Sequence, residues 1–284
     1  MNSSHSEPAW VRRTLIGSAL AAMAVVLVVP LVAVFWEGLA AGWQVYWAAV
    51  TDPDARHAIW LTLLAAAISL VINGVAGIAA AWAIAKFRFP GRSLLITAIE
   101  LPFSVSPVVV GLLFVLLFGS HGWFGAWLQS HDVRVIFAMP GIVLATLFIT
   151  FPFVVRELLP VMEAVGSEEE EAARVLGARG WQILWRITLP NVKWGLMYGL
   201  ILCSARAIGE FGAVSVVSGH IRGETNTMPL HVEILYNDYQ YNAAFACASV
   251  LCLTALVTLV LKAVVEWRAE RALNQAKVKG GVEA

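Results

Sequence analysis

The stretch SEEEEAARVLGARGWQILWRITLP, residues 167–190, is polar and charged in a chain that is otherwise strongly apolar. Ser167 and Glu170 have the S-x-x-E spacing of a capping box, in which the hydroxyl and the carboxylate each accept a backbone N–H at a helix start. The glutamates after the serine favour the same start, because the helix dipole stabilises negative charge in its first turn. Gly177 is expected to end the helix in a left-handed conformation. The stretch therefore predicts a short helix that begins after Ser167 and ends at Gly177.

A second short helix is expected after Gly177. Four of its residues recur at helical spacing and should share one face: Trp181, Leu184, Trp185 and Thr188. Pro190 fits the first position of a further helix, where its missing N–H costs nothing. The prediction is an elbow of two short helices, acidic at one end and aromatic along one side.

The composition around this elbow is that of a membrane protein. Apolar residues make up 60% of the chain, charged residues 13%, and the mean hydropathy is +0.77. Soluble domains contain about 25% charged residues. The net charge of +0 gives no sign of a nucleic-acid partner. The three cysteines lie inside apolar runs without metal-ligand spacing and are interpreted as small packing residues.

Six apolar stretches are long enough, at about 1.5 Å per residue, to cross a hydrocarbon core of about 30 Å. They cover residues 15–36, 58–85, 94–118, 135–155, 191–217 and 243–265. The first is interpreted as an uncleaved helix, because a signal-peptide core has only about 7–15 apolar residues. The third contains Pro102 and Pro107 and should be broken, with Glu100 either paired near the break or lining a pathway. The fold class predicted is all-α: one transmembrane domain over residues 1–284, with a core at about 58–265 and the elbow within a loop at about 157–192.

Three segments between these stretches are expected to lie outside the membrane. Residues 37–57 and 119–134 are rich in aromatic side chains, which favour the headgroup level, and are predicted to be interfacial loops. Residues 219–241 form a polar loop with a short helix at about 229–236. The histidines in this loop, His220 and His231, are expected to be solvated, because no metal-ligand spacing accompanies them.

Lys and Arg residues are distributed unevenly between the two sides of the predicted membrane. The loops 37–57, 119–134 and 219–241 carry only Arg56, Arg134 and Arg222. The remaining segments carry Arg12, Arg13, Lys86, Arg88, Arg92, Arg156, Arg174, Arg179, Arg186, Lys193, Lys262, Arg268, Arg271, Lys277 and Lys279. Basic residues favour the cytoplasmic side. Both termini and the elbow are therefore predicted to be cytoplasmic.

The elbow resembles the EAA loop of the permease subunits of bacterial ABC importers, the binding-protein-dependent inner-membrane permease family. The fixed positions of that pattern are found here in full: Glu171, Ala172, Ala173, Gly177, Ile187, Leu189 and Pro190. The resemblance implies that the first elbow helix sits in a cleft of a separate ATPase subunit, with the last three positions shaping the exit of the loop. The alternative is a short amphipathic connector between two membrane helices, solvated on its acidic face.

Arg206 and Glu210 lie inside the fifth apolar stretch. A charged side chain at the centre of a membrane helix costs about 2.5–3.5 kcal/mol on insertion scales. The two residues are four apart, so they share a helix face and can pair. Two compatible interpretations remain open: a neutralised pair that fixes helix packing, or groups lining a translocation path, with Arg206 presenting positive potential to an anion.

The segment SARAIGEFGA, residues 204–213, resembles the fifth-helix signature of sulfate and molybdate permeases, and residues 214–236 resemble W-type permease subunits of sulfate/thiosulfate importers. This resemblance implies a bacterial inner-membrane complex with a second, different permease subunit, an ATPase dimer and a periplasmic sulfate-binding protein. ATP and Mg would bind the ATPase, and this chain would carry no cofactor. Molybdate or tungstate is the alternative substrate.

Two other classes fit less well. An ion-coupled secondary transporter is expected to show internal repeats and a coupling-ion site, and the sequence indicates neither. An intramembrane enzyme would need a catalytic constellation. The chain has no H-E-x-x-H sequence, phosphate-binding loop or nucleophile elbow, so ATP hydrolysis is expected on a separate chain.

Overall fold

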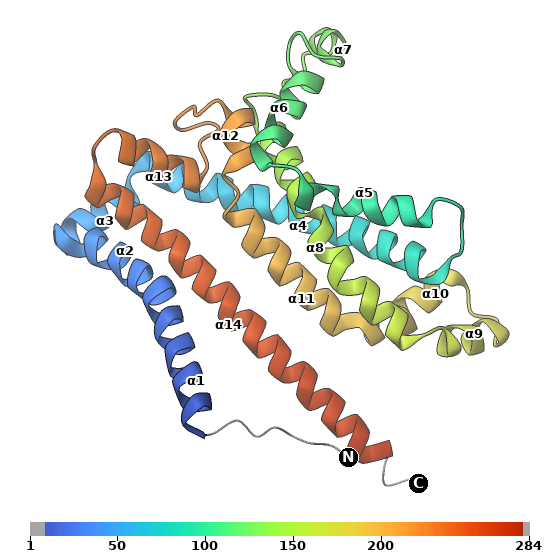
Figure 1. The fold of residues 1–284 in the computed structure, drawn as a ribbon. Helices are drawn as coiled ribbons and strands as arrows, with labels where there is room; N and C mark the ends of the chain where they lie inside the picture. Colours follow the sequence, from blue (N-terminus) through green and yellow to red (C-terminus); the bar gives the residue numbers. More distant parts are fainter. Residues whose placement is uncertain (1–8, 281–284) are drawn as a thin grey trace.

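The computed structural model describes residues 9–280, and within that range every regular element is helical (Figure 1). The elements are α1 (Ala9–Met23), η1 (Ala24–Val28, a π-helical turn), α2 (Val29–Ala40), α3 (Trp43–Thr51), α4 (Pro53–Lys86), α5 (Arg92–Ser104), α6 (Pro107–Phe118), α7 (Gly125–Ser130), α8 (Met139–Val165), α9 (Glu168–Val175), α10 (Gly180–Ile183), η2 (Leu184–Thr188, also π-helical), α11 (Leu189–Ile208), α12 (Gly212–Ser218), α13 (Met228–Asn237) and α14 (Tyr241–Gly280). The all-α prediction is confirmed for these residues.

Four described helical stretches are long and apolar enough to cross a membrane: Trp10–Ala40, Pro53–Lys86, Met139–Val165 and Tyr241–Ala269. Two further pairs meet the same test together but are bent: α5 with α6 by 109°, and the continuous stretch Gly180–Ile208, which ends with α11, with α12 by 51°. The structure thus contains four candidate spans, or up to six if each bent pair crosses once. The third and fifth predicted spans are not straight helices.

The centre of the bundle is formed by α4, α8 and α11, which pack against one another. Gly77 on α4 permits the closest approach, because a Cβ there would lie 2.6 Å from Val154 Cγ1 on α8. Asn73 donates to Thr150 Oγ1 at 2.8 Å, which links the same two helices through a buried hydrogen bond. Small and polar residues therefore join these helices beside a cluster of buried apolar side chains that all three helices share.

The bend between α5 and α6 follows from Pro107. A residue that precedes proline avoids the helical region, and Ser106 has φ −58° and ψ 132°. Val105 is extended as well, so α5 ends at Ser104 and α6 begins anew at Pro107. Pro102 lies inside α5 without ending it. Glu100, on the same helix, is exposed in this chain.

The prediction of an interfacial loop over residues 37–57 is wrong, because most of this segment is helical. α2 extends to Ala40, α3 covers Trp43–Thr51, and α4 begins at Pro53. Asp52 caps α4 by accepting the Asp54 N–H at 2.9 Å, and Pro53 occupies the first turn, where it needs no partner. The aromatic residues of this segment thus lie on helix α3, and α4 starts earlier than predicted.

The short helix expected near residues 229–236 is present as α13, but it packs against α4 and α14. Leu230 is fully buried, and His231 is only 4% exposed. The prediction of a solvated His231 is therefore wrong. The ring Nδ1 lies 3.5 Å from Asn226 Nδ2. Burial has the largest effect on the pKa of His231 and lowers it from its ordinary value of 6.5. The negative charges of Asp54 and Asp52 raise this pKa and the positive charge of Arg222 lowers it, and the net shift is downward.

This environment predicts a loss of stability in mild acid. The unfolded chain binds a proton at His231 near pH 6.5, whereas the folded chain binds it only at lower pH. Stability therefore falls as the pH drops through about 6.5 towards the lower, folded-state pKa. We expect His231→Gln to reduce the difference in Tm between pH 7.5 and pH 5.5 in detergent, and the exposed His121→Gln to leave it unchanged. An undiminished difference in His231→Gln would contradict this account.

Candidate functional site: the elbow and the break in the fifth membrane segment

The first helix of the elbow, α9, begins after Ser167 as predicted, but the capping box is wrong. The Ser167 hydroxyl donates to Glu171 Oε1 at 2.7 Å and makes no capping bond. Glu170 points inward instead of returning to the cap: it accepts from Thr188 Oγ1 at 2.7 Å and pairs with Lys86 Nζ at 3.2 Å. Long-range partners thus displace the local motif.

Gly177 adopts the left-handed conformation that the sequence predicts, with φ +84°. Its N–H donates to the Arg174 carbonyl at 3.0 Å, and the Ala178 N–H donates to the Ala173 carbonyl at 3.0 Å. These bonds satisfy carbonyls that the end of α9 would otherwise leave free. The chain can then reverse direction towards α10.

The second arm of the elbow does not end before Pro190. α10, η2 and α11 follow one another without a break, and the Leu189 N–H donates to the Leu184 carbonyl across the π-helical turn. A π-turn changes the hydrogen-bond register, so the missing N–H of Pro190 is accommodated within a continuous helix. The predicted aromatic side is present, because Trp181 and Trp185 lie together and are both exposed. Thr188 is buried, so its place on that face is wrong.

Apolar side chains project from the elbow into solvent. Val175 and Leu176 are each 88% exposed, and Trp181 and Trp185 are 69% and 56% exposed. The two indole rings meet edge to face at 5.5 Å. Exposed apolar groups of this size, on a segment with charged residues around them, mark an interaction surface. We call these four residues the apolar tip.

Sequence reasoning missed two contacts that tie the elbow to the bundle. Lys86 at the end of α4 reaches Glu170, and Asn191 on α11 donates to Glu169 Oε2 at 2.5 Å. The run of glutamates was a signal for a helix start. The side chains that these glutamates contact are far away in the chain or beyond the turn, so spacing alone does not indicate them.

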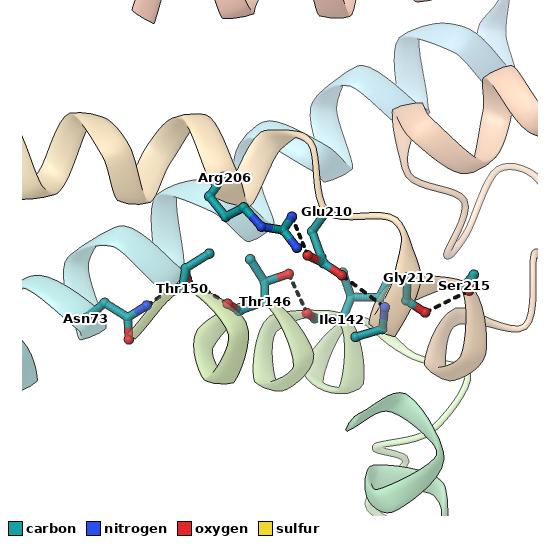
Figure 2. Close-up of polar contacts among 9 residues, drawn as sticks. Asn73, Ile142, Thr146, Thr150, Arg206, Glu210, Gly212 and Ser215 are labelled. Atoms are coloured by element: carbon teal, nitrogen blue, oxygen red, sulfur yellow. Dashed lines mark hydrogen bonds and ion pairs between the residues drawn. The ribbon is translucent and has the colours of Figure 1, made fainter. Parts of the chain in front are cut away.

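The Arg206–Glu210 pair forms at the break between α11 and α12 (Figure 2). Arg206 Nη1 lies 2.6 Å from Glu210 Oε2; the Glu210 side chain is 1% exposed and that of Arg206 is 33% exposed. Glu210 Oε1 also accepts the Ala213 N–H at 2.9 Å, so the carboxylate caps α12. At this break the backbone of Gly212 lies close to Pro107. A Cβ at position 212 would come within 2.9 Å of the proline Cβ, so only glycine fits here without a shift.

A row of polar side chains on the central helices approaches this break. Figure 2 shows Asn73, Thr150 and Thr146 following one another towards Glu210. All three are buried, at 1%, 0% and 2% exposure. Arg206, with 33% of its side chain exposed, is the partly exposed member of the ion pair beside this row. Among the residues whose side chains the structure describes, no group of three or more His, Cys, Asp and Glu side chains could hold a metal ion.

The profile of the family described as "Binding-protein-dependent transport system inner membrane component" matches residues 73–272, which include the elbow, the break and most of the bundle. The chain belongs to this family. It is a membrane permease subunit of an ABC transporter, with several apolar helices long enough to cross a bilayer, and not an enzyme.

The permease is 52% identical over 258 residues to the sulfate transport system permease protein CysW of Synechocystis sp., covering 91% of this chain and 94% of that one. It is 50% identical to CysW of Escherichia coli K12, covering 94% and 91% of the two chains. The sulfate transport system permease protein CysT of Escherichia coli K12 is 37% identical, with 86% and 88% covered. A solved bacterial alginate ABC transporter shares the fold, with a TM-score of 0.75, 19% identity and 93% and 95% coverage.

Proposed function

We propose that this permease forms the membrane path of an ATP-driven importer for sulfate and thiosulfate in the bacterial inner membrane. The observation that carries the proposal is identity of at least 50% to two sulfate permeases over more than nine-tenths of all three chains. The more distant CysT relative, also named for sulfate, supports the same substrate class. Its difference from the CysW proteins favours an assembly of two unlike permease subunits.

The topology we propose has six spans, with both termini and the elbow in the cytoplasm. The two bent pairs then each cross the membrane once, in addition to the four straight stretches. In Figure 1, α3, α12 and α13 gather at one end of the long helices, whereas α9, α10 and the turn after α4 lie at the other. The excess of Lys and Arg in the segments at the elbow end supports a cytoplasmic location for that end.

We infer that the elbow couples this chain to a separate ATPase dimer, which binds ATP and Mg. The apolar tip offers side chains that a cleft in the ATPase would cover. Glu171 and Ala172 are exposed on α9, while Ala173 is half-buried. Gly177 sets the reversal after α9, and Ile187, Leu189 and Pro190 lead into α11. A periplasmic sulfate-binding protein would deliver the substrate at the opposite end.

The break at Arg206 and Glu210 is the part of this chain that we propose lies on the translocation path. Arg206 presents a partly exposed guanidinium, whose planar donors suit a tetrahedral oxyanion. Glu210 neutralises that charge in the present conformation, which favours weak and transient binding of an anion. High affinity would then belong to the binding protein.

Uptake of radiolabelled sulfate by cells that lack this chain tests the proposal. We expect uptake to be lost on deletion, restored by the intact gene, and little affected by excess molybdate. If sulfate uptake survives and molybdate uptake falls, the substrate is a different oxyanion. Uptake that persists after ATP depletion but collapses with the ion gradient would indicate a secondary transporter instead.

A further inference from the structure

A buried ionic cluster lies behind the elbow and consists of Lys86, Glu170 and Thr188. The Lys86 and Glu170 side chains are 10% and 9% exposed, and Lys86 Nζ lies 3.2 Å from Glu170 Oε1. Thr188 Oγ1 donates to the same carboxylate oxygen at 2.7 Å. Lys86 also donates to the backbone carbonyl of Gly166, between α8 and α9. Each polar group in the cluster therefore has a partner that replaces water.

The three side chains come from three parts of the fold. Lys86 is the last residue of α4, Glu170 lies in the first turn of α9, and Thr188 ends η2 directly before α11. The cluster thus ties the elbow helix to a central membrane helix on one side and to the start of α11 on the other. Asn191, in the first turn of α11, holds Glu169 in a second link of the same kind.

We propose that Lys86 and Glu170 are positioning residues for energy coupling, an inference that rests on the proposed function. Removing either charge would leave the other largely buried without its counter-charge, which strongly destabilises a buried pair, so we expect the two side chains to act as one unit. Displacement of α9 by the ATPase is then transmitted to α11 through Thr188. α11 has 20 residues and is about 30 Å long, and its far end carries the Arg206–Glu210 break.

A second ion pair at the same end of the molecule supplies a matched control. Arg92 Nη2 lies 2.8 Å from Glu163 Oε1, but these side chains are 40% and 49% exposed. It links α5 to α8 and does not involve the elbow helix. Exposed ion pairs contribute little, because water screens them. Loss of this pair should leave coupling intact.

The test uses the full transporter, with both permeases and the ATPase, in proteoliposomes with sulfate-loaded binding protein. Lys86→Met, Lys86→Arg, Thr188→Val and Arg92→Met are compared with wild type in two quantities: stimulation of ATP hydrolysis by the loaded binding protein, and sulfate transported per ATP. For Lys86→Met we expect an assembled complex with basal hydrolysis, stimulation lowered at least about fivefold, and a lower transport ratio. Lys86→Arg should restore both quantities to within about twofold of wild type, and Arg92→Met should match wild type.

Wild-type stimulation and transport ratio in Lys86→Met would overturn the proposal. If Lys86→Met does not assemble, the Thr188→Val variant decides, because it keeps both charges and removes one hydrogen bond. A lower ratio of sulfate transported per ATP in Thr188→Val supports transmission through Thr188. An unchanged ratio overturns the proposal. Wild-type vesicles that fail to transport sulfate would contradict the proposed substrate. The coupling comparison would then use molybdate-loaded binding protein, so the two failures are distinguishable.

Discussion

Replacing Gly177 by valine is expected to lower sulfate uptake about tenfold or more while the protein still reaches the membrane. Gly177 has φ +84°, a region that a β-branched residue enters only with strain. Such strain amounts to roughly 1–3 kcal/mol, and every ~1.4 kcal/mol changes an equilibrium tenfold. The strained turn would swing the end of α9, and with it Val175 and Leu176, away from the orientation that fits the ATPase. Uptake and the amount of ATPase that co-purifies with the permease measure the effect.

Gly177→Asn is the matched control for this prediction. Asparagine tolerates the left-handed region far better than valine does. A Cβ at position 177 would meet nothing within 4 Å in this chain, so added bulk alone does not disturb the fold. We therefore expect the asparagine variant to keep most of the uptake. An equal loss in both variants would locate the effect in side-chain contact with the ATPase and contradict the backbone explanation.

The behaviour of Gly177 was predictable because the conformation of a helix end depends on neighbouring residues. The same holds for the break at Pro107, where the proline restricts the residue before it. The break near Glu210 is not indicated in this way, because the sequence predicts one continuous span over residues 191–217 and the spacing of Arg206 and Glu210 also fits an unbroken helix. The start of α4 also has a local signal, because Asp52, Pro53 and Asp54 form a capping sequence, whereas the aromatic residues before them favour a loop prediction.

The inward direction of Glu170 was not predictable in the same way. Its partners include Lys86, which is far away in the chain, and Thr188, which follows the turn of the elbow. The buried ammonium of Lys86 stabilises the Glu170 carboxylate more than a single exposed backbone N–H at the helix start would, so Glu170 does not cap α9. The π-turn η2 likewise depends on how α11 must meet the elbow, and the sequence around Pro190 is equally consistent with a new helix start. Tertiary contacts decide both features.

Arg206→Met is the other substitution expected to have a large effect, because it leaves the Glu210 carboxylate buried with only the Ala213 N–H as a partner. Breaking a buried pair costs about 3–5 kcal/mol, and the partly exposed Arg206 places this one at roughly 2–3 kcal/mol. We expect a lower Tm and strongly reduced sulfate uptake. By itself this result would not separate a packing role from a pathway role.

The double variant Arg206→Met/Glu210→Gln separates the two roles. Glutamine keeps an oxygen that can accept the Ala213 N–H, so α12 stays capped, and no buried charge is left without a partner. We expect the Tm to return to within a few degrees of wild type. If Arg206 lies on the anion path, uptake stays low although the fold has recovered, because the guanidinium that attracts the oxyanion is still missing. If uptake recovers together with the Tm, the pair serves only to pack the break, and the path must run elsewhere.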